Sequence, residues 1–330
     1  MTDWQFDAAN GTAVVRTVLG DVASTELGRV DYHEHLFQVS PLLPGEDLDD
    51  ADASTAEARL LAGSGFEAMV DATPLGLGRR PLALRAASVG SGLHVVATTG
   101  AHRAEHYRDQ AWVIALDETD LEQSFVRDVV MGIPEADGRD APRSSVRAGV
   151  LKAGLGYWRI GPFERRVLRA VAAAHRATGA PVMVHLEHGT AAHEVLDLLA
   201  GDGVPAGRVA LAHVDRNLDV GLHTELAARG ALLGYDGPAR ARSAPDSAVL
   251  ACLAAVVDRG WGAHLLLGGD VARRSRYVAY GGMPGLAYLG DRFVPRLVDM
   301  VGAAQADSVL RDNPARWLTF TPTAYPPAAG

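Results

Sequence analysis

Short apolar runs alternate with longer amphipathic, alanine-rich segments along most of the chain. The amphipathic segments, such as 162–178 and 191–199, have helical spacing, and several stop at a glycine that is typical of a helix end. Short apolar runs without polar alternation are typical of strands buried on both faces, as in a parallel sheet. Eight such runs are present, at residues 29–35, 66–72, 94–99, 148–152, 181–186, 209–214, 231–235 and 264–269.

Eight strand–helix units in one chain predict an α/β fold of the (β/α)8 TIM-barrel type. The rival, a doubly wound open sheet, is disfavoured because no G-x-G-x-x-G turn follows the first strand. Segment 101–145 is the longest interruption, and we expect a loop and one helix there, inserted at the barrel mouth. We therefore expect residues 1–330 to form a single domain, with 1–28 as an N-terminal lead-in.

Composition narrows the class of protein. Of the 330 residues, 48% are hydrophobic and 22% are charged, which is typical of a soluble globular protein with a large core. The net charge of −9, with scattered acidic residues, argues against a nucleic-acid-binding surface. A single cysteine, Cys252, excludes an internal disulfide framework and fits a reducing compartment.

Cellular location and partners follow from the same observations. The N-terminus lacks a basic head and an apolar signal segment, and no apolar run reaches the ~18 residues that a membrane helix needs. We expect a cytoplasmic protein with a small-molecule substrate and no membrane contact. Barrels of this size often form homodimers, which is our expectation here.

One lysine stands out in the composition. Lys152 is the only lysine, and the other 30 of the 31 basic Lys and Arg residues are arginine. Arginine serves a surface charge or a salt bridge as well or better, whereas only a primary amine reacts with a carbonyl carbon or with CO2. Lys152 also ends an apolar run, where a surface lysine is uncommon. These features favour a chemical role for Lys152.

Ligand-forming side chains lie at the ends of several predicted strands. The carboxyl ends of the strands carry the active site in a barrel of this kind. His33 and His35 are two residues apart and share one face of the first strand, so both imidazoles can reach one metal ion. A single histidine at a strand end is usually a satisfied core residue, but six groups on one side of one barrel predict a metal site: His33, His35, Lys152, His185, His213 and Asp270.

The number of groups indicates two metal ions. Four imidazoles, one lysine and one aspartate exceed the ligands of one tetrahedral Zn2+ but suit two divalent ions that share ligands. Neutral lysine is a poor bridging ligand, whereas its carbamate with CO2 is an anionic carboxylate that can span two cations. We therefore predict that Lys152 is N-carboxylated.

These residues carry a family resemblance over nearly the whole chain. The opening motifs resemble those of the phosphotriesterase-like family in the amidohydrolase superfamily, and the six ligand candidates continue the match in order. The motifs are Thr17-Val18-Leu19-Gly20, Glu26-Leu27-Gly28-Arg29, His33-Glu34-His35-Leu36 and Asp312-Asn313-Pro314.

The resemblance implies a (β/α)8 barrel with a binuclear metal centre, most often zinc. It implies that His33, His35 and Asp270 bind the more buried ion, that His185 and His213 bind the more exposed ion, and that carboxylated Lys152 bridges the two. A water that bridges two divalent cations has its pKa lowered from ~15.7 toward ~7 and supplies hydroxide at neutral pH. Asp270 would then take the proton toward the leaving group, which makes Asp270 and Lys152 the catalytic candidates.

The resemblance stops short of a substrate, because the family includes lactonases and phosphotriesterases. Lactonases that the chain resembles often have a tyrosine soon after a Thr-Gly pair. Here His102 and Arg103 occur near Thr99-Gly100 instead, so the resemblance gives weaker grounds for predicting hydrolysis of acyl-homoserine lactones. Arginines after strands seven and eight are suited to a phosphate or carboxylate, as in members that hydrolyse phosphorylated sugar lactones. The predicted substrate-binding residues are His102, Arg240, Arg242, Arg273, Arg276 and Tyr277.

Our principal interpretation is a metal-dependent hydrolase that opens a lactone, phosphorylated or otherwise anionic. Two alternatives remain open: hydrolysis of a phosphotriester, and a catalytically silent member of the family that binds a small molecule. The arginines at the mouth argue against a neutral, bulky triester, and the complete ligand set argues against a silent binder.

Overall fold

The computed structural model describes residues 12–138 and 141–322, and its central feature is an eight-stranded parallel sheet in the strand order β10-β9-β8-β7-β6-β5-β4-β3. Each predicted run overlaps one strand. The strands are β3 (Val30–Glu34), β4 (Ala68–Asp71), β5 (His94–Gly100), β6 (Ala148–Gly154), β7 (Val182–His185), β8 (Val209–Ala212), β9 (Leu232–Tyr235) and β10 (Leu265–Leu267).

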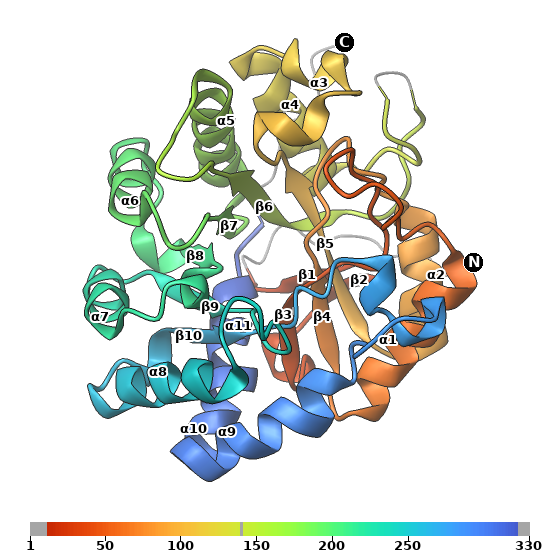
Figure 1. Ribbon diagram of the computed structural model, residues 1–330. Helices are drawn as coiled ribbons and strands as arrows, with labels where there is room; N and C mark the ends of the chain where they lie inside the picture. Colours follow the sequence, from red (N-terminus) through yellow and green to blue (C-terminus); the bar gives the residue numbers. More distant parts are fainter. Residues whose placement is uncertain (1–11, 139–140, 323–330) are drawn as a thin grey trace.

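The sheet curls into a nearly closed barrel. The two outermost strands, β3 and β10, approach each other, and the Asp270 amide just after β10 donates to the His33 carbonyl of β3 at 2.9 Å. The strands lie at the centre and helices surround them (Figure 1). The predicted TIM-barrel fold is therefore confirmed.

Helices connect successive strands and cover the outer face of the barrel. The α5 segment shows why, since a proline opens it, Gly179 in the left-handed conformation ends it, and its apolar residues face the sheet. The helices are α1 (Ala51–Gly63), α2 (Pro81–Ser91), α3 (Ala111–Ile114), α4 (Glu118–Val130), α5 (Pro162–Thr178), α6 (Ala192–Gly201), α7 (Val220–Ala228), α8 (Asp246–Asp258), α9 (Val294–Val301), α10 (Ala303–Asp307) and α11 (Asn313–Leu318).

The segment between β5 and β6 differs from the expected loop and single helix. It contains the short 3-10 helix Ala104–Tyr107, then α3, then α4. The two short helical pieces have four residues each, too few to show a 3.6-residue hydrophobic period. The α4 helix packs against α5, so it takes the place of the barrel's own helix between β5 and β6 rather than forming part of an insertion.

The described part of the expected lead-in is ordered at the amino-terminal end of the barrel. Strands β1 (Val15–Thr17) and β2 (Gly20–Val22) form an antiparallel hairpin. The hairpin contacts the starts of two barrel strands, because the Val18 amide donates to the Val95 carbonyl of β5 and the Arg16 carbonyl lies against Gly149 of β6. The single-domain organisation stays a prediction, since residues 1–11, 139–140 and 323–330 lie outside the described residues.

The Asp312-Asn313-Pro314 motif supports the barrel from the same end. The Asn313 side chain is fully buried, and its amide donates to the carbonyls of Gly262 and Leu265 at 2.9 and 2.8 Å. This motif therefore fixes the start of β10 and does not contribute to the carboxyl-end loops.

Unusual backbone conformations gather at the opposite end. Every non-glycine residue with positive φ among residues 12–138 and 141–322 lies on a loop that follows a barrel strand. Such conformations cost about 1–3 kcal/mol each and are retained mainly at functional sites. The residues are Trp158, His188, Ala191, His213, Ala239, Asp270 and Ala272.

Candidate metal centre

Five strands bring the six predicted ligands to the carboxyl end of the barrel. Each of the six side chains is at least nine-tenths buried, although imidazoles and carboxylates favour water. His33 and Lys152 lie within β3 and β6, and His185 is the last residue of β7. His35, His213 and Asp270 follow the ends of β3, β8 and β10.

The first group consists of His33, His35 and Asp270. The Nε2 atoms of His33 and His35 lie 3.7 and 3.6 Å from Asp270 Oδ1. These separations are too long for hydrogen bonds, but they suit three atoms that each lie about 2.1 Å from a common ion. The His33 Nε2 atom is buried without a hydrogen-bond partner, so this nitrogen is available as a ligand.

The second group consists of His185 and His213. Their facing nitrogens, His185 Nδ1 and His213 Nε2, lie 2.7 Å apart. The other nitrogen of each ring contacts a carboxylate, at 2.9 Å from His185 Nε2 to Glu187 and 2.6 Å from His213 Nδ1 to Asp236. A carboxylate only accepts, so these contacts place the ring protons there and turn two lone pairs toward each other.

Protonation of either ring would relieve this contact, but burial opposes it. Burial lowers the pKa of His213 to about 4 and the pKa of His185 well below its ordinary value. Two neutral imidazoles with facing lone pairs repel each other unless a cation lies between them. This contact and the unpartnered His33 nitrogen show that the residues present fit divalent metal ions.

Asp236 connects the two groups. Its carboxylate accepts from His33 Nδ1 at 3.0 Å, from His213 Nδ1 at 2.6 Å, and from the Tyr32 hydroxyl. Burial opposes its ionisation, but His213 and His33 hold the pKa of Asp236 well below its ordinary value. An ionised Asp236 therefore orients one ring from each group, as carboxylates beside ligating histidines commonly do.

Lys152 lies within the same cluster. Its side chain is 1% exposed and Nζ donates to the Ala72 carbonyl at 2.8 Å. Burial lowers the pKa of the Lys152 ammonium to about 8. Burial and then the Lys152 charge lower the pKa of His35, and that charge also lowers the pKa of His185. The amine is thus buried and does not point outward.

Glycine on the neighbouring strand allows this placement. Gly100 of β5 is paired with Lys152 and has φ +106°. A Cβ at this position would lie 2.0 Å from the Lys152 carbonyl oxygen and 2.6 Å from its nitrogen. Only glycine lets β5 approach the lysine-bearing backbone so closely.

Two of the predicted substrate-binding residues contact ligand candidates. Arg240 donates to both the carbonyl and the carboxylate of Asp270, and its charge, against the cost of burial, helps to hold the pKa of Asp270 below its ordinary value. Tyr277 is fully buried and donates to the His35 carbonyl, and its role in substrate binding stays a prediction. Sequence position alone did not distinguish a residue behind the ligands from one facing the mouth.

The other predicted substrate residues have varied surroundings. His102 is buried with its ring centroid 4.4 Å from that of His185, and its Nδ1 accepts from the Arg103 amide, which leaves the ring proton on Nε2. Arg242 and Arg273 are exposed on the loops after β9 and β10, whereas Arg276 is partly buried. A role in substrate binding stays a prediction for these four residues.

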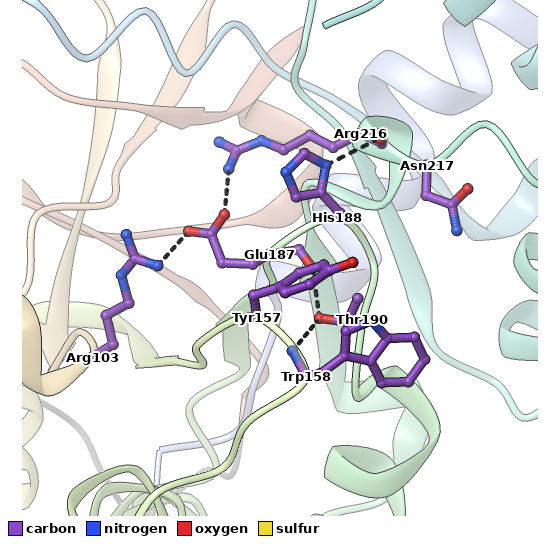
Figure 2. A pocket seen from close by; sticks show the side chains of 8 residues that line it. All are labelled: Arg103, Tyr157, Trp158, Glu187, His188, Thr190, Arg216 and Asn217. Atoms are coloured by element: carbon purple, nitrogen blue, oxygen red, sulfur yellow. Dashed lines mark hydrogen bonds and ion pairs between the residues drawn. The ribbon is translucent and has the colours of Figure 1, made fainter.

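A hollow of about 580 Å³ opens beside the second ligand group. Figure 2 shows Glu187 between two arginines, with its contacts to Arg103 at 2.7 Å and Arg216 at 3.6 Å. Glu187 also contacts His185 Nε2 at 2.9 Å, so one lining residue of the hollow touches a ligand candidate. Its lining residues are Arg103, Tyr157, Trp158, Glu187, His188, Thr190, Arg216 and Asn217.

Several supporting residues were missed from the sequence. Thr73 accepts from His35 Nδ1 at 2.8 Å and donates to the Phe37 carbonyl, so it fixes that ring as the carboxylates fix the others. The positions of Asp236, just after β9, and of Glu187, two residues after His185, were the available signals. The prediction for the loop after β9 named its arginines and did not include Asp236.

No helix within residues 12–138 and 141–322 combines the length and the apolar character needed to cross a membrane.

Relatives of known name cover nearly the whole chain. A phospho-furanose lactonase from Mycoplasmopsis synoviae is 31% identical over 323 residues, covering 92% of this chain and 91% of the relative. A lactonase structure from Listeria monocytogenes is 32% identical with a TM-score of 0.83, covering 93% and 99% of the two chains. An N-acetyltaurine hydrolase from Danio rerio is 27% identical, covering 93% of this chain and 98% of the relative.

The phosphotriesterase family model matches residues 13–318, which include every ligand candidate described above. This match spans more of the chain than any single motif. Its named lactonase relatives support an enzyme that hydrolyses ester bonds. The chain therefore belongs to the phosphotriesterase family.

Proposed function

We propose that this protein is a metal-dependent lactonase whose substrate carries an anionic group. The observation that carries the metal requirement is the pair of imidazole lone pairs 2.7 Å apart between His185 and His213. The lactone preference is supported by the relatives named as lactonases, which share about a third of the residues.

Two divalent cations, most often zinc in such sites, would fit the six buried residues. His33, His35 and Asp270 would hold one ion, and His185 and His213 the other, with N-carboxylated Lys152 between them. Ions held there lower the pKa of a water molecule toward neutrality and polarise a substrate carbonyl.

The residues of the chain have separate tasks. Asp236, Thr73 and Glu187 fix the ring tautomers, so that four imidazole lone pairs point inward. Asp270 Oδ1 faces the first group, while Oδ2 faces Arg240 and lies 3.4 Å from Arg216. We propose that Asp270 is ligand and proton acceptor together and passes the proton to the departing alkoxide of the opened ring.

The anionic group would be bound by exposed arginines at the barrel mouth. Arg242 and Arg273 follow β9 and β10 and are free of the buried ion pairs that hold Arg240. A phosphotriesterase activity remains the second candidate, because the same activated water attacks a phosphorus centre. A catalytically silent binding protein would not need six buried metal-ligand candidates, because burying such polar groups costs free energy.

The proposal is tested with a panel of γ- and δ-lactones, with and without a phosphate group, and the triester paraoxon, against protein loaded with zinc, manganese or cobalt. We expect hydrolysis of lactones, a higher kcat/KM for phosphorylated members, and loss of activity after chelation. Preferred turnover of paraoxon would favour the second candidate, and binding without turnover of any compound would favour the silent binder.

A further inference from the structure

The seam between β3 and β10 carries the first ligand group, His33, His35 and Asp270. These two strands stand at opposite ends of the strand order, so within the described part of the chain no strand ladder pairs them. The hydrogen bond from the Asp270 amide to the His33 carbonyl lies beside this seam. The seam that holds three ligand candidates therefore depends on contacts other than regular strand pairing.

Two carboxylates on β3 hold the segment that follows β10. Asp31 Oδ1 accepts from the Gly269 amide at 3.3 Å. Glu34 Oε2 accepts from the Val271 amide at 3.0 Å. The amides on both sides of Asp270 are thus bound by side chains of one strand, and the Asp270 amide itself is bound by a carbonyl of the same strand.

The segment approaches both carboxylates closely because it begins with two glycines. A Cβ on Gly268 would lie 2.9 Å from Asp31 Oδ1, and a Cβ on Gly269 would lie 2.1 Å from Glu34 Oε1. Asp270 follows with φ 40°, a left-handed conformation that is costly for a residue other than glycine. A strained backbone persists only where its surroundings hold it, and the contacts to the carboxylates are suited to this.

The burial of these carboxylates costs free energy. Asp31 and Glu34 are fully buried, and within the described residues Asp31 Oδ2 and Glu34 Oε1 have no hydrogen-bond partner. A buried carboxylate oxygen without a partner loses its hydration without full compensation. Well-packed apolar side chains would serve packing alone at a lower cost. The two residues therefore indicate a role that needs their acceptor oxygens.

We propose that Asp31 and Glu34 are positioning residues for Asp270. By holding the amides of Gly269 and Val271, they fix the Asp270 backbone so that Oδ1 approaches the Nε2 atoms of the two histidines in the first group. Neither residue needs to contact the ion or the substrate for this role. This inference rests on the proposed metal centre and adds the residues that set the geometry of its aspartate ligand.

The hold on the backbone is measured first in the metal-free protein, by hydrogen–deuterium exchange of a peptide that covers residues 268–272. Glu34→Met keeps the length of the side chain but removes the acceptor, and we expect exchange there to become about tenfold faster. Glu34→Gln keeps an acceptor oxygen and should stay within about twofold of the wild type. Asp31→Leu and Asp31→Asn should show the same contrast.

A milder variant keeps the proposal testable if Glu34→Met does not fold. Glu34→Asp retains the carboxylate but is shorter by one methylene, so it reaches the Val271 amide less well. We expect exchange at residues 268–272 to become about threefold faster in this variant. Exchange at the wild-type rate in Glu34→Asp and in Asp31→Leu would show that the carboxylates do not hold the segment.

The consequence for the metal centre is measured by cadmium-113 NMR of the cadmium-loaded protein. The first-group resonance is the one that His35→Ala removes, and the second-group resonance is the one that His185→Ala removes. Glu34→Met should weaken cadmium binding at the first group about tenfold and shift its resonance, because Asp270 is no longer held. The second-group resonance should persist. With a lactone that the wild type hydrolyses, kcat should fall about tenfold and KM should change less than about twofold.

Glu57→Met is the matched control. Glu57 is also fully buried, and its oxygens accept from the amides of Ala279 and Leu286 at 2.6 and 3.1 Å, further along the same loop. This variant should lower stability but leave exchange at residues 268–272 and both cadmium resonances as in the wild type. Equal effects of Glu34→Met and Glu57→Met, or an unchanged first-group resonance in Glu34→Met, would overturn the proposal.

Failure of the proposed function is recognised separately. A protein that binds cadmium but hydrolyses no lactone refutes the lactonase, while the exchange and NMR contrasts still decide whether Asp31 and Glu34 position Asp270. A protein that binds no divalent ion at either group refutes the metal centre and this inference with it.

Discussion

Asp236 links a ligand of each proposed metal position through one carboxylate, because its oxygens accept from the Nδ1 atoms of His33 and His213. Asp236→Asn replaces one acceptor with an amide donor, which faces an imidazole N–H or forces a tautomer change. We expect metal affinity to fall about 10- to 100-fold. Competition with a chelator followed by metal analysis measures this.

A matched control is Asp219→Asn. Asp219 caps α7 by accepting from the amides of Gly221 and Leu222, and asparagine caps helices equally well. Metal affinity should stay at the wild-type value in this variant. Equal metal affinity in Asp236→Asn and Asp219→Asn would contradict the role assigned to Asp236.

The lowered pKa of Lys152 has a consequence for the metal-free protein. Burial lowers this pKa from 10.5 to about 8, so the unfolded chain binds more protons than the folded chain between these values. Stability should therefore rise with pH between about 8 and 10.5 and be independent of this group below about 8. Lys152→Met should remove this part of the pH dependence, which thermal unfolding at several pH values measures. An identical slope in both proteins would show that Lys152 is not the buried amine described.

At the scale of elements, the approach of β5 to β6 depends on Gly100. Gly100→Ala places a methyl group 2.0 Å from the Lys152 carbonyl oxygen, at a φ that alanine disfavours. We expect the free energy of unfolding to fall by roughly 2 kcal/mol or more, together with reduced metal content. Chemical denaturation is the measurement. Gly201→Ala at the end of α6, where a Cβ meets nothing within 4 Å, is the control and should be near neutral.

The loops after β9 and β10 supply the proposed anion contacts. Arg242→Ala and Arg273→Ala should each raise KM for a phosphorylated lactone by about tenfold and change it little for a neutral lactone, since a charge-assisted hydrogen bond is lost only with the anion. Steady-state kinetics on matched lactone pairs measures this. Similar changes on both substrates would exclude these arginines as the anion site.

At the scale of the whole molecule, the barrel was predictable because each strand is short, apolar and separated from the next by a helical segment. That the six candidate side chains gather at one end of the barrel was predictable, because parallel strands bring their carboxyl ends to one side. Asp236, Glu187 and Thr73 could not be assigned in the same way. Their roles depend on which ring nitrogen each one faces, which sequence spacing does not determine.

Side-chain direction also limited the prediction of substrate contacts. Arg240 and Tyr277 lie on mouth loops, as expected, but they turn inward to Asp270 and His35. Tyr157 and Trp158 follow β6, and their sequence pattern does not distinguish exposed aromatics from core ones. Their exposure and the 3.0 Å contact of Trp158 with Thr190 are properties of the folded loops.

The central claim is that Lys152, as a carbamate, holds two divalent ions among four histidines and Asp270. Carbon-13 NMR of protein loaded with metal in 13C-bicarbonate tests it directly, because the chain has one lysine and a side-chain carbamate has one possible position. We predict one carbamate carbon and about two divalent ions per chain, with both lost in Lys152→Met. Two bound ions without a carbamate signal, or unchanged metal content and activity in Lys152→Met, would contradict the account.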